Sequence, residues 1–272
     1  MRVFSYGGGV QSNAVLVLSA QGVLPYKQFV FSNVGADSEH PDALEYIQNV
    51  VKPYAKKHGL EIIEIEKKLR SGQTETLWGR LMKPGSKSMP IPVFMSTGAP
   101  AGRACTSDFK VQTISKWLKQ QGATKENPAI SGIGISTDEA GRARSESGIP
   151  HQKLEYPLLD LRLTRQDCVN IVIKAGLPKP PKSSCFFCPF HTLPAWQELH
   201  DKRPDLFQKS VLLEQTINEK RKSNGLNNVY LTRFGKPLDQ VVDGSHQKQL
   251  KMFEETPDDR YSCGPFVCSN PL

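Results

Sequence analysis

The sequence predicts an α/β fold, a Rossmann-like parallel sheet with helices on both faces, followed by a cysteine-containing helical C-terminal extension. Short apolar, strand-like runs recur near residues 3–4, 28–31, 61–65 and 129–133, and segments with helical spacing separate them. A glycine-rich loop joins the first run to an apolar helical run at residues 14–18. A C-x-x-C motif follows a proline-rich connector. We therefore expect a nucleotide-binding α/β domain over residues 1–180 and an extension with the C-x-x-C and a cysteine tail over residues 181–272.

Composition is that of a soluble protein with an anionic partner. Hydrophobic residues make up 38% and charged residues 23% of the 272 residues, and no run reaches the ~18 apolar residues of a membrane span. The N-terminus lacks the apolar core of a signal peptide, so we expect a cytoplasmic protein whose six cysteines are reduced and available for metal. The net charge of +8 favours binding to a nucleotide or nucleic acid.

The loop after the first strand has the composition of a phosphate cradle. Adjacent glycines allow positive φ and inward-facing N–H groups, and the helix that follows directs its positive end to the same point. The loop lacks the Lys-Ser/Thr of a Walker A motif, and a plain glycine turn is the alternative interpretation. The candidate nucleotide-binding residues are Ser5, Tyr6, Gly7, Gly8, Gly9, Gln11 and Ser12.

This stretch resembles the SGGxxS loop of the PP-loop nucleotide enzymes, which include ATP pyrophosphatases and sulfonucleotide (PAPS/APS) reductases. Gln11 stands where many members carry Asp. The loop after the second strand, residues 32–41, resembles the D-T-G-x-x-x-P-E-T stretch of the PAPS reductase-like family, with Asn33 at the acidic position. The resemblance implies that ATP and Mg²⁺ bind over residues 7–12 and that Asn33 hydrogen-bonds the nucleoside.

The chain then continues with a helical pattern over residues 42–58 and a third strand over 61–65. Residues 70–100 are rich in Gly and Pro, and we expect a lid over a substrate or a plain mobile insertion. Next, Arg103, Cys105 and Lys110 resemble the R-x-C-x-x-x-x-K entry to the family's cysteine site. Read alone, Cys105 is a buried apolar residue.

Residues 134–144 follow the fourth strand and resemble the family's G-x-R-x-x-E-S-x-x-R loop. Gly134, Glu139 and either Arg142 or Arg144 occupy its main positions. A helix from Asp138 would place the two arginines on different faces, so that one reaches the phosphates; a surface capping segment is the alternative. Farther on, Thr164 is a candidate N-cap for a helix over residues 168–175 that Gly176 ends.

The cysteines form the second candidate site. Cys185 and Cys188 offer two thiolates on one side of a tight bend, the arrangement that zinc or an iron–sulfur cluster requires. Cys105 precedes Cys185 by 80 residues, similar to the spacing in cluster-bearing reductases. Aromatic neighbours and the resemblance favour a [4Fe–4S] cluster over zinc, and two buried packing cysteines are the remaining alternative. The fourth-ligand candidates are His191, Cys263 and Cys268; we favour Cys263 as ligand and Cys268 as a catalytic thiol.

Taken in order, these motifs resemble the family across most of residues 2–190. The resemblance implies an ATP pyrophosphatase or adenylating sulfurtransferase acting in DNA or tRNA thiolation, with a sulfur donor protein as partner and Arg142 or Arg144 on the phosphates. One alternative is a sulfonucleotide reductase; another is a zinc-containing nucleic-acid-binding protein with a vestigial nucleotide loop. The cations at residues 220–222 suit either a helix C-terminus or a nucleic-acid backbone. The acceptor and the oligomeric state stay open.

Overall fold

The computed structural model describes residues 1–242. They form two compact units, and the chain leaves the first unit twice. The first unit contains residues 1–76 and 106–184, and the second contains residues 77–105 and 185–242. Most of the Gly- and Pro-rich stretch at residues 70–100 therefore belongs to the same unit as the C-x-x-C motif.

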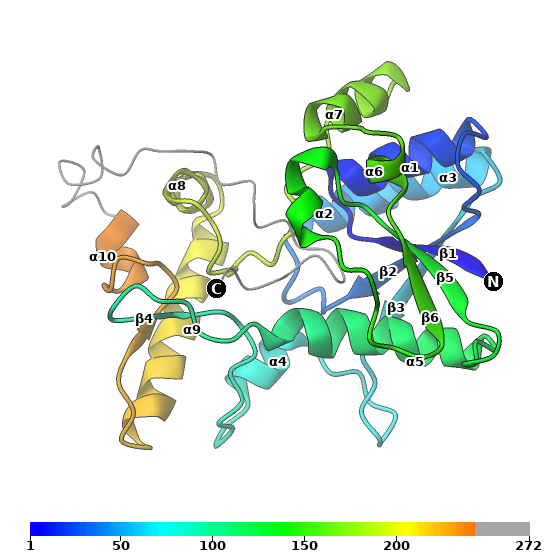
Figure 1. The fold of residues 1–272 in the computed structure, drawn as a ribbon. Helices are drawn as coiled ribbons and strands as arrows, with labels where there is room; N and C mark the ends of the chain where they lie inside the picture. Colours follow the sequence, from blue (N-terminus) through cyan, green and yellow to red (C-terminus); the bar gives the residue numbers. More distant parts are fainter. Residues whose placement is uncertain (243–272) are drawn as a thin grey trace. The chain divides into compact units, whose positions relative to one another are not determined.

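A five-stranded parallel sheet forms the centre of the first unit, with strand order β3-β2-β1-β5-β6 (Figure 1). This confirms the predicted α/β fold. Phe4 of the central strand pairs with Phe29 on one side and Gly132 on the other. We did not predict the last strand of this order, because its sequence contains no apolar run. The strands are β1 (Arg2–Tyr6), β2 (Gln28–Asn33), β3 (Glu61–Glu66), β5 (Ala129–Ile133) and β6 (Gln152–Glu155).

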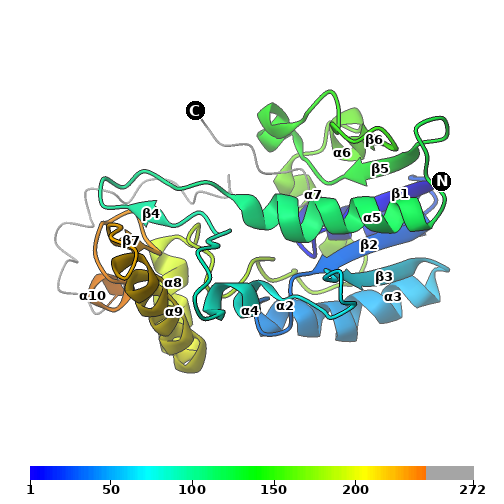
Figure 2. The same cartoon turned by 90° about the horizontal axis from the view of Figure 1, so that it is seen from below.

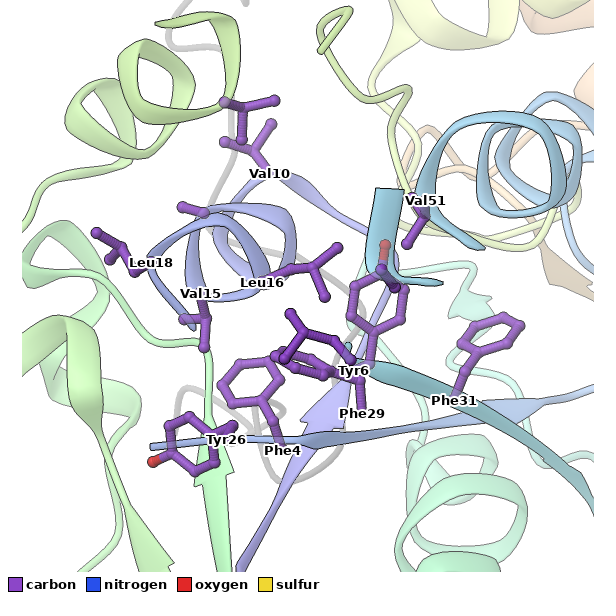
Figure 3. Close-up of a cluster of buried hydrophobic side chains, with 14 of the residues drawn as sticks. Phe4, Tyr6, Val10, Val15, Leu16, Leu18, Tyr26, Phe29, Phe31 and Val51 are labelled. Atoms are coloured by element: carbon purple, nitrogen blue, oxygen red, sulfur yellow. The ribbon is translucent and has the colours of Figure 1, made fainter. Parts of the chain in front are cut away.

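Helices cover both faces of this sheet (Figures 1 and 2). On one face, side chains from alternate positions of a strand, such as Phe4 and Tyr6 of β1, pack beneath apolar side chains of α1 including Leu16 (Figure 3). On the other face, Val3 and Val30 pack against α5. The first face carries α1 (Val10–Ala20), α2 (Pro41–Tyr46), α3 (Lys52–Lys57), α6 (Pro157–Asp160) and α7 (Arg165–Lys174), and the second carries α5 (Gln112–Gln120).

The helical pattern at residues 42–58 is interrupted in the structure. A π-helical segment, Ile47–Val51, separates α2 from α3. Pro53 lies in the first turn of α3. Because proline has no N–H to donate to the preceding turn, the helix widens just before it.

Two other predicted helices differ at their starts. The helix expected near Asp138 is a 3₁₀ helix, Thr137–Arg142, in which Glu139 has the non-helical angles φ −117° and ψ 16°. The helix expected from residue 168 begins three residues earlier, as α7. Thr164 is its N-cap, as predicted, and forms a reciprocal capping box with Asp167.

The second unit is mainly helical. Its core includes the buried rings of Phe187, Trp196 and Phe207. Glu214 is also buried, and its two carboxylate oxygens accept hydrogen bonds from the backbone N–H groups of Leu231 and Leu238, at 2.6 and 2.9 Å. The elements are α4 (Leu77–Met82), β4 (Phe94–Met95), α8 (Leu193–Lys202), α9 (Pro204–Lys222), β7 (Val229–Tyr230) and α10 (Leu238–Val242).

The structure assigns short elements to the stretch that we expected to be a lid or mobile insertion. Leu77 and Leu81 of α4 are buried, and β4 pairs with β7 in a small antiparallel sheet. Within residues 1–242, no helix has both the length and the apolar character that crossing a bilayer requires.

Candidate nucleotide and cysteine sites

The strand order locates a switch point in the first unit. From β1 the chain runs outward through β2 and β3 on one side, and later through β5 and β6 on the other. The loops that follow β1 and β5 therefore meet at the carboxyl edge of the sheet. A methyl group built on Gly134 would lie 3.4 Å from Cβ of Gln11, so the segment after β5 lies close to the first turn of α1. Open α/β sheets bind their ligands in the crevice at this point.

The glycine loop after β1 is held by a short relay of side chains. The Tyr6 hydroxyl donates to Oδ1 of Asn13 at 2.9 Å, and Nδ2 of Asn13 donates to the carbonyls of Gly8 and Gly9 at 3.2 and 2.9 Å. Oγ of Ser12 accepts from the N–H of Gly7 at 3.0 Å. Tyr6 and Ser12, two predicted nucleotide ligands, thus also brace the loop.

The first turn of α1 has no side-chain cap. Gly9 is its N-cap residue and has no side chain that could accept a hydrogen bond from the N–H groups of this helix end. Gly8 adopts φ +78°, a conformation that favours glycine. A loop with this shape at an uncapped helix N-terminus offers main-chain donors to an anion.

The proline-rich connector lies against the same loop. The hydroxyl of Ser183 donates to the carbonyl of Gly7, and the backbone carbonyl of Ser184 accepts from the N–H of His40 at 3.2 Å. The hydroxyl of Tyr46 holds the start of the connector by donating to the carbonyl of Pro178 at 2.7 Å. Sequence reasoning missed Ser183, because its partner is 176 residues away.

A charged cluster borders the loop on the side of β5. Nε2 of Gln11 donates to Glu139 at 3.2 Å, and Oε1 of Gln11 accepts from Arg165 at 3.1 Å. Arg142 forms a 2.6 Å ion pair with Glu139. The two residues are three apart in the chain, within the kinked 3₁₀ segment. Burial raises the pKa of Glu139, and the guanidinium groups of Arg142 and Arg165 oppose that rise.

The two candidate arginines have different surroundings, but not because they lie on two faces of one helix: the 3₁₀ helix ends at Arg142, and Arg144 lies beyond it. Arg142 is largely buried beside Glu139, whereas Arg144 is exposed. The backbone of Arg144 is fixed by the hydroxyl of Tyr156, which accepts from its N–H and donates to its carbonyl, both at 2.8 Å. Arg165, at the start of α7, supplies a further guanidinium at this loop, and we did not predict it from the sequence.

The side-chain amide of Asn33 forms hydrogen bonds within the protein. Its Nδ2 donates to Glu64 at 2.8 Å and its Oδ1 accepts from the N–H of Gly35 at 2.8 Å. Gly35 has φ +122°, and a methyl group there would lie 2.4 Å from the Asp37 carboxylate. Asn33 therefore shapes the turn after β2, and a nucleoside contact through its side chain would require one of these bonds to exchange.

A buried ionisable pair that we did not predict lies near the end of β2. Glu39 is 2% and Lys110 is 5% exposed. Burial raises the pKa of Glu39, and the Lys110 ammonium and a backbone hydrogen bond from Val34 oppose the rise. Lys110 comes from a π-helical segment, Thr106–Val111, whose Phe109 carbonyl accepts from Ser32 of β2 at 2.7 Å.

Several buried polar atoms at this edge have no hydrogen-bond partner within the described residues. They are Oγ of Ser5 in β1, Oγ of Ser136 after β5 and Oε1 of Glu39 after β2. Buried polar groups in folded proteins are nearly always paired with protein or solvent. Three such atoms, one in β1, one after β5 and one after β2, are consistent with a polar ligand at the switch point.

The three predicted cysteine ligands in the described residues belong to the second unit. Cys105, Cys185 and Cys188 are not in disulfides. The C-x-x-C turn is closed by the N–H of Cys188, which donates to the carbonyl of Cys185 at 3.1 Å. Trp78, Phe186 and Phe187 pack around it, with ring centroids 4.9 to 5.7 Å apart. Cys168 is fully buried on α7 of the first unit.

The set of metal ligands is incomplete in the described part of the chain. Within residues 1–242, no group of three or more His, Cys, Asp or Glu side chains is arranged to hold a metal ion. The ring of His191, a candidate fourth ligand, packs against Trp196 with centroids 4.9 Å apart. Cys263 and Cys268, the predicted ligand and catalytic thiol, lie outside the described residues.

Comparison with known proteins adds no relative: no protein-family model, curated protein or solved structure matches this chain.

Proposed function

We propose that the first unit binds an adenine nucleotide, ATP with Mg²⁺, at the carboxyl edge of its sheet, and that the protein is an adenylating PP-loop enzyme. The observation that carries the proposal is the glycine loop and the N-terminus of α1 at the switch point, together with three nearby buried atoms. Oγ of Ser5, Oγ of Ser136 and Oε1 of Glu39 have no hydrogen-bond partner within residues 1–242. Nucleotide phosphates are the anions that such loops hold.

Each part of the site has a task in this proposal. Main-chain N–H groups of Gly8, Gly9 and the first turn of α1 bind phosphate oxygens. The guanidinium groups of Arg165 and Arg142 stabilise negative charge beside the loop, with Gln11 and Glu139 orienting them. Mg²⁺ prefers one or two carboxylates in addition to substrate phosphates, and Glu39 is a buried carboxyl group at this edge.

The reaction follows from the resemblance of the motifs to PP-loop enzymes. An acceptor oxygen attacks the α-phosphorus of ATP; the new O–P bond forms as the bond to the β-phosphate bridge breaks, and pyrophosphate leaves. A sulfur nucleophile from a donor protein then displaces AMP from the activated acceptor. Arg144, exposed and anchored by Tyr156, is the proposed additional cation for the phosphates. The basic charge of the chain is compatible with a nucleic-acid acceptor.

The second unit supplies the proposed cluster site. Three cysteine thiolates with surrounding aromatic rings have the donor chemistry for [4Fe–4S], with zinc as the alternative. Cys105, Cys185 and Cys188 would be ligands and Cys263 the fourth, and a cluster would supply electron transfer or an iron site for sulfide. No step above depends on it.

The test is anaerobic purification of the full chain, followed by iron, sulfide and zinc analysis and an assay of ATP turnover on the same sample. We expect iron and sulfide in the protein, and AMP and pyrophosphate as products in equal amounts. Sulfite release from PAPS or APS, without ATP turnover, would instead support a sulfonucleotide reductase. Bound zinc with no nucleotide binding would contradict the proposal and would favour the alternative of a zinc-containing nucleic-acid-binding protein.

A further inference from the structure

Two segments that are far apart in the sequence form one surface of the second unit. β4 pairs with β7, with Phe94 opposite Tyr230 and Met95 opposite Val229 (Figure 2). The turns that follow them also pack closely. A methyl group on Gly98 would lie 3.1 Å from the carbonyl oxygen of Arg233, and one on Gly235 would lie 3.0 Å from that of Ser96.

Partly exposed aromatic rings gather on these segments. Residues directly opposite in an antiparallel pair project to the same side, so Phe94 and Tyr230 share a face, and Val229, which is buried, points to the other. The ring of Phe190 meets that of Phe94 edge-on, with centroids 6.2 Å apart. Phe234 follows β7. All four rings keep part of their surface in solvent.

Guanidinium groups lie over two of these rings. The guanidinium carbon of Arg103 is 5.0 Å from the ring centroid of Phe190, and that of Arg233 is 5.7 Å from the centroid of Phe234. We call these six residues the aromatic platform: Phe94, Arg103, Phe190, Tyr230, Arg233 and Phe234.

The net positive charge of the chain comes from the two stretches that supply most of the platform. Residues 77–105 and 220–238 contain nine lysines and arginines and no Asp or Glu. The whole chain sums to +8, so all its other residues together have a formal charge of −1. The stretches also meet at the end of α9, where Nζ of Lys220 donates to the carbonyls of Leu81 and Lys83 at 2.7 and 2.9 Å. These carbonyls are neutral, so the two bonds do not offset the positive charge of Lys220.

A polyanion with flat, stackable groups fits this chemistry best. Single-stranded nucleic acid offers phosphates to the cations and unpaired bases to the rings, whereas the bases of a duplex are already stacked. An acidic peptide would use the cations and offer the rings no stacking partner.

We propose that the aromatic platform binds single-stranded nucleic acid. This proposal rests on the proposed function in one respect, namely that the bound nucleic acid is the acceptor of the reaction. It places the acceptor on the unit that carries Cys105, Cys185 and Cys188. Binding itself requires neither ATP nor a metal, so it is tested separately.

The experiment is fluorescence anisotropy of the full chain with labelled single-stranded DNA and RNA of about 12 nucleotides, within the ~4–16-nucleotide sites of single-strand-binding folds. ATP is absent. We expect binding that weakens as salt rises, with a duplex of equal length bound less tightly. Arg233→Glu should weaken binding by about tenfold or more. The matched control is Lys209→Glu, which reverses an exposed charge on α9 in the same unit and should change binding less than about twofold.

A second pair of variants separates stacking from charge. Tyr230→Leu removes the ring and should weaken binding by about tenfold, whereas Tyr230→Phe keeps it and should bind as the wild type does. Equal effects of Arg233→Glu and Lys209→Glu, or wild-type binding by Tyr230→Leu, would overturn the proposal, as would failure of the wild type to bind either oligonucleotide. ATP binding measured on the same samples reports the first unit. If the wild type binds the oligonucleotide but does not bind ATP, the proposed function is contradicted and the nucleic-acid proposal is not.

Discussion

Replacing Gly8 by alanine tests whether the shape of the glycine loop matters. Gly8 has φ +78°, where an alanine costs about 1–2 kcal/mol more than glycine. The new methyl group would also lie 3.2 Å from Oγ of Ser183 and 3.4 Å from Cδ1 of Ile47, so the connector must shift slightly. Relief of this strain would move the loop N–H groups. We expect Gly8→Ala to unfold at about 2–4 °C lower temperature per kcal/mol lost, and to bind ATP at least tenfold more weakly.

Gly9→Ala is the matched control. Gly9 has φ −85° and ψ −178°, and a methyl group there would meet only Cβ of Ser183, at 3.8 Å. This backbone suits any residue, so the variant should be as stable as the wild type or up to ~1 kcal/mol more stable. Thermal unfolding and isothermal titration with ATP on both variants give the comparison. If Gly8→Ala matched Gly9→Ala in stability and in ATP affinity, the conformation of Gly8 would not matter to the proposed phosphate cradle.

Three further predictions concern other parts of the chain. Burial raises the pKa of Glu214 from 4.5 to about 7; the folded state therefore keeps this proton longer, and its stability should fall as pH rises from 4.5 to 7. Glu214→Gln should reduce this pH dependence of stability, measured by urea unfolding. An unchanged pH dependence would mean that other groups cause it. Arg165→Ala should weaken ATP binding by about tenfold while Arg162→Ala, an exposed neighbour, leaves it unchanged; equal affinities would remove Arg165 from the site. Thr164→Ala should destabilise the protein by about 1 kcal/mol through loss of the α7 cap, and an unchanged unfolding midpoint would contradict that role.

Local patterns were enough to predict most of the sheet and several helix boundaries. The apolar runs of β1, β2, β3 and β5 and the N-cap Thr164 are recognisable within a few residues. β6 has the sequence Gln-Lys-Leu-Glu and no such pattern, and its place is set by pairing with β5. The π-helical break before Pro53 depends on which backbone groups that residue leaves unbonded, which periodicity alone does not report.

The candidate site was predictable in its loops but not in its contacts. The glycine loop and the loop after β5 were both marked by their own residues. The partners of Gln11 are Glu139, 128 residues away, and Arg165, 154 residues away, so only the topology of the sheet brings them together. The same holds for Ser183 on Gly7. Lys110 was marked by its motif, but the burial of Lys110 and Glu39 beside each other carried no local signal.

The central claim is that a nucleotide binds where the loops after β1 and β5 meet, and hydrogen–deuterium exchange with and without ATP tests it most directly. We expect ATP to slow exchange in peptides that cover residues 7–13 and 134–142, while those of α9 in the second unit stay unchanged. Slower exchange confined to other segments, or no change at saturating ATP, would contradict the account.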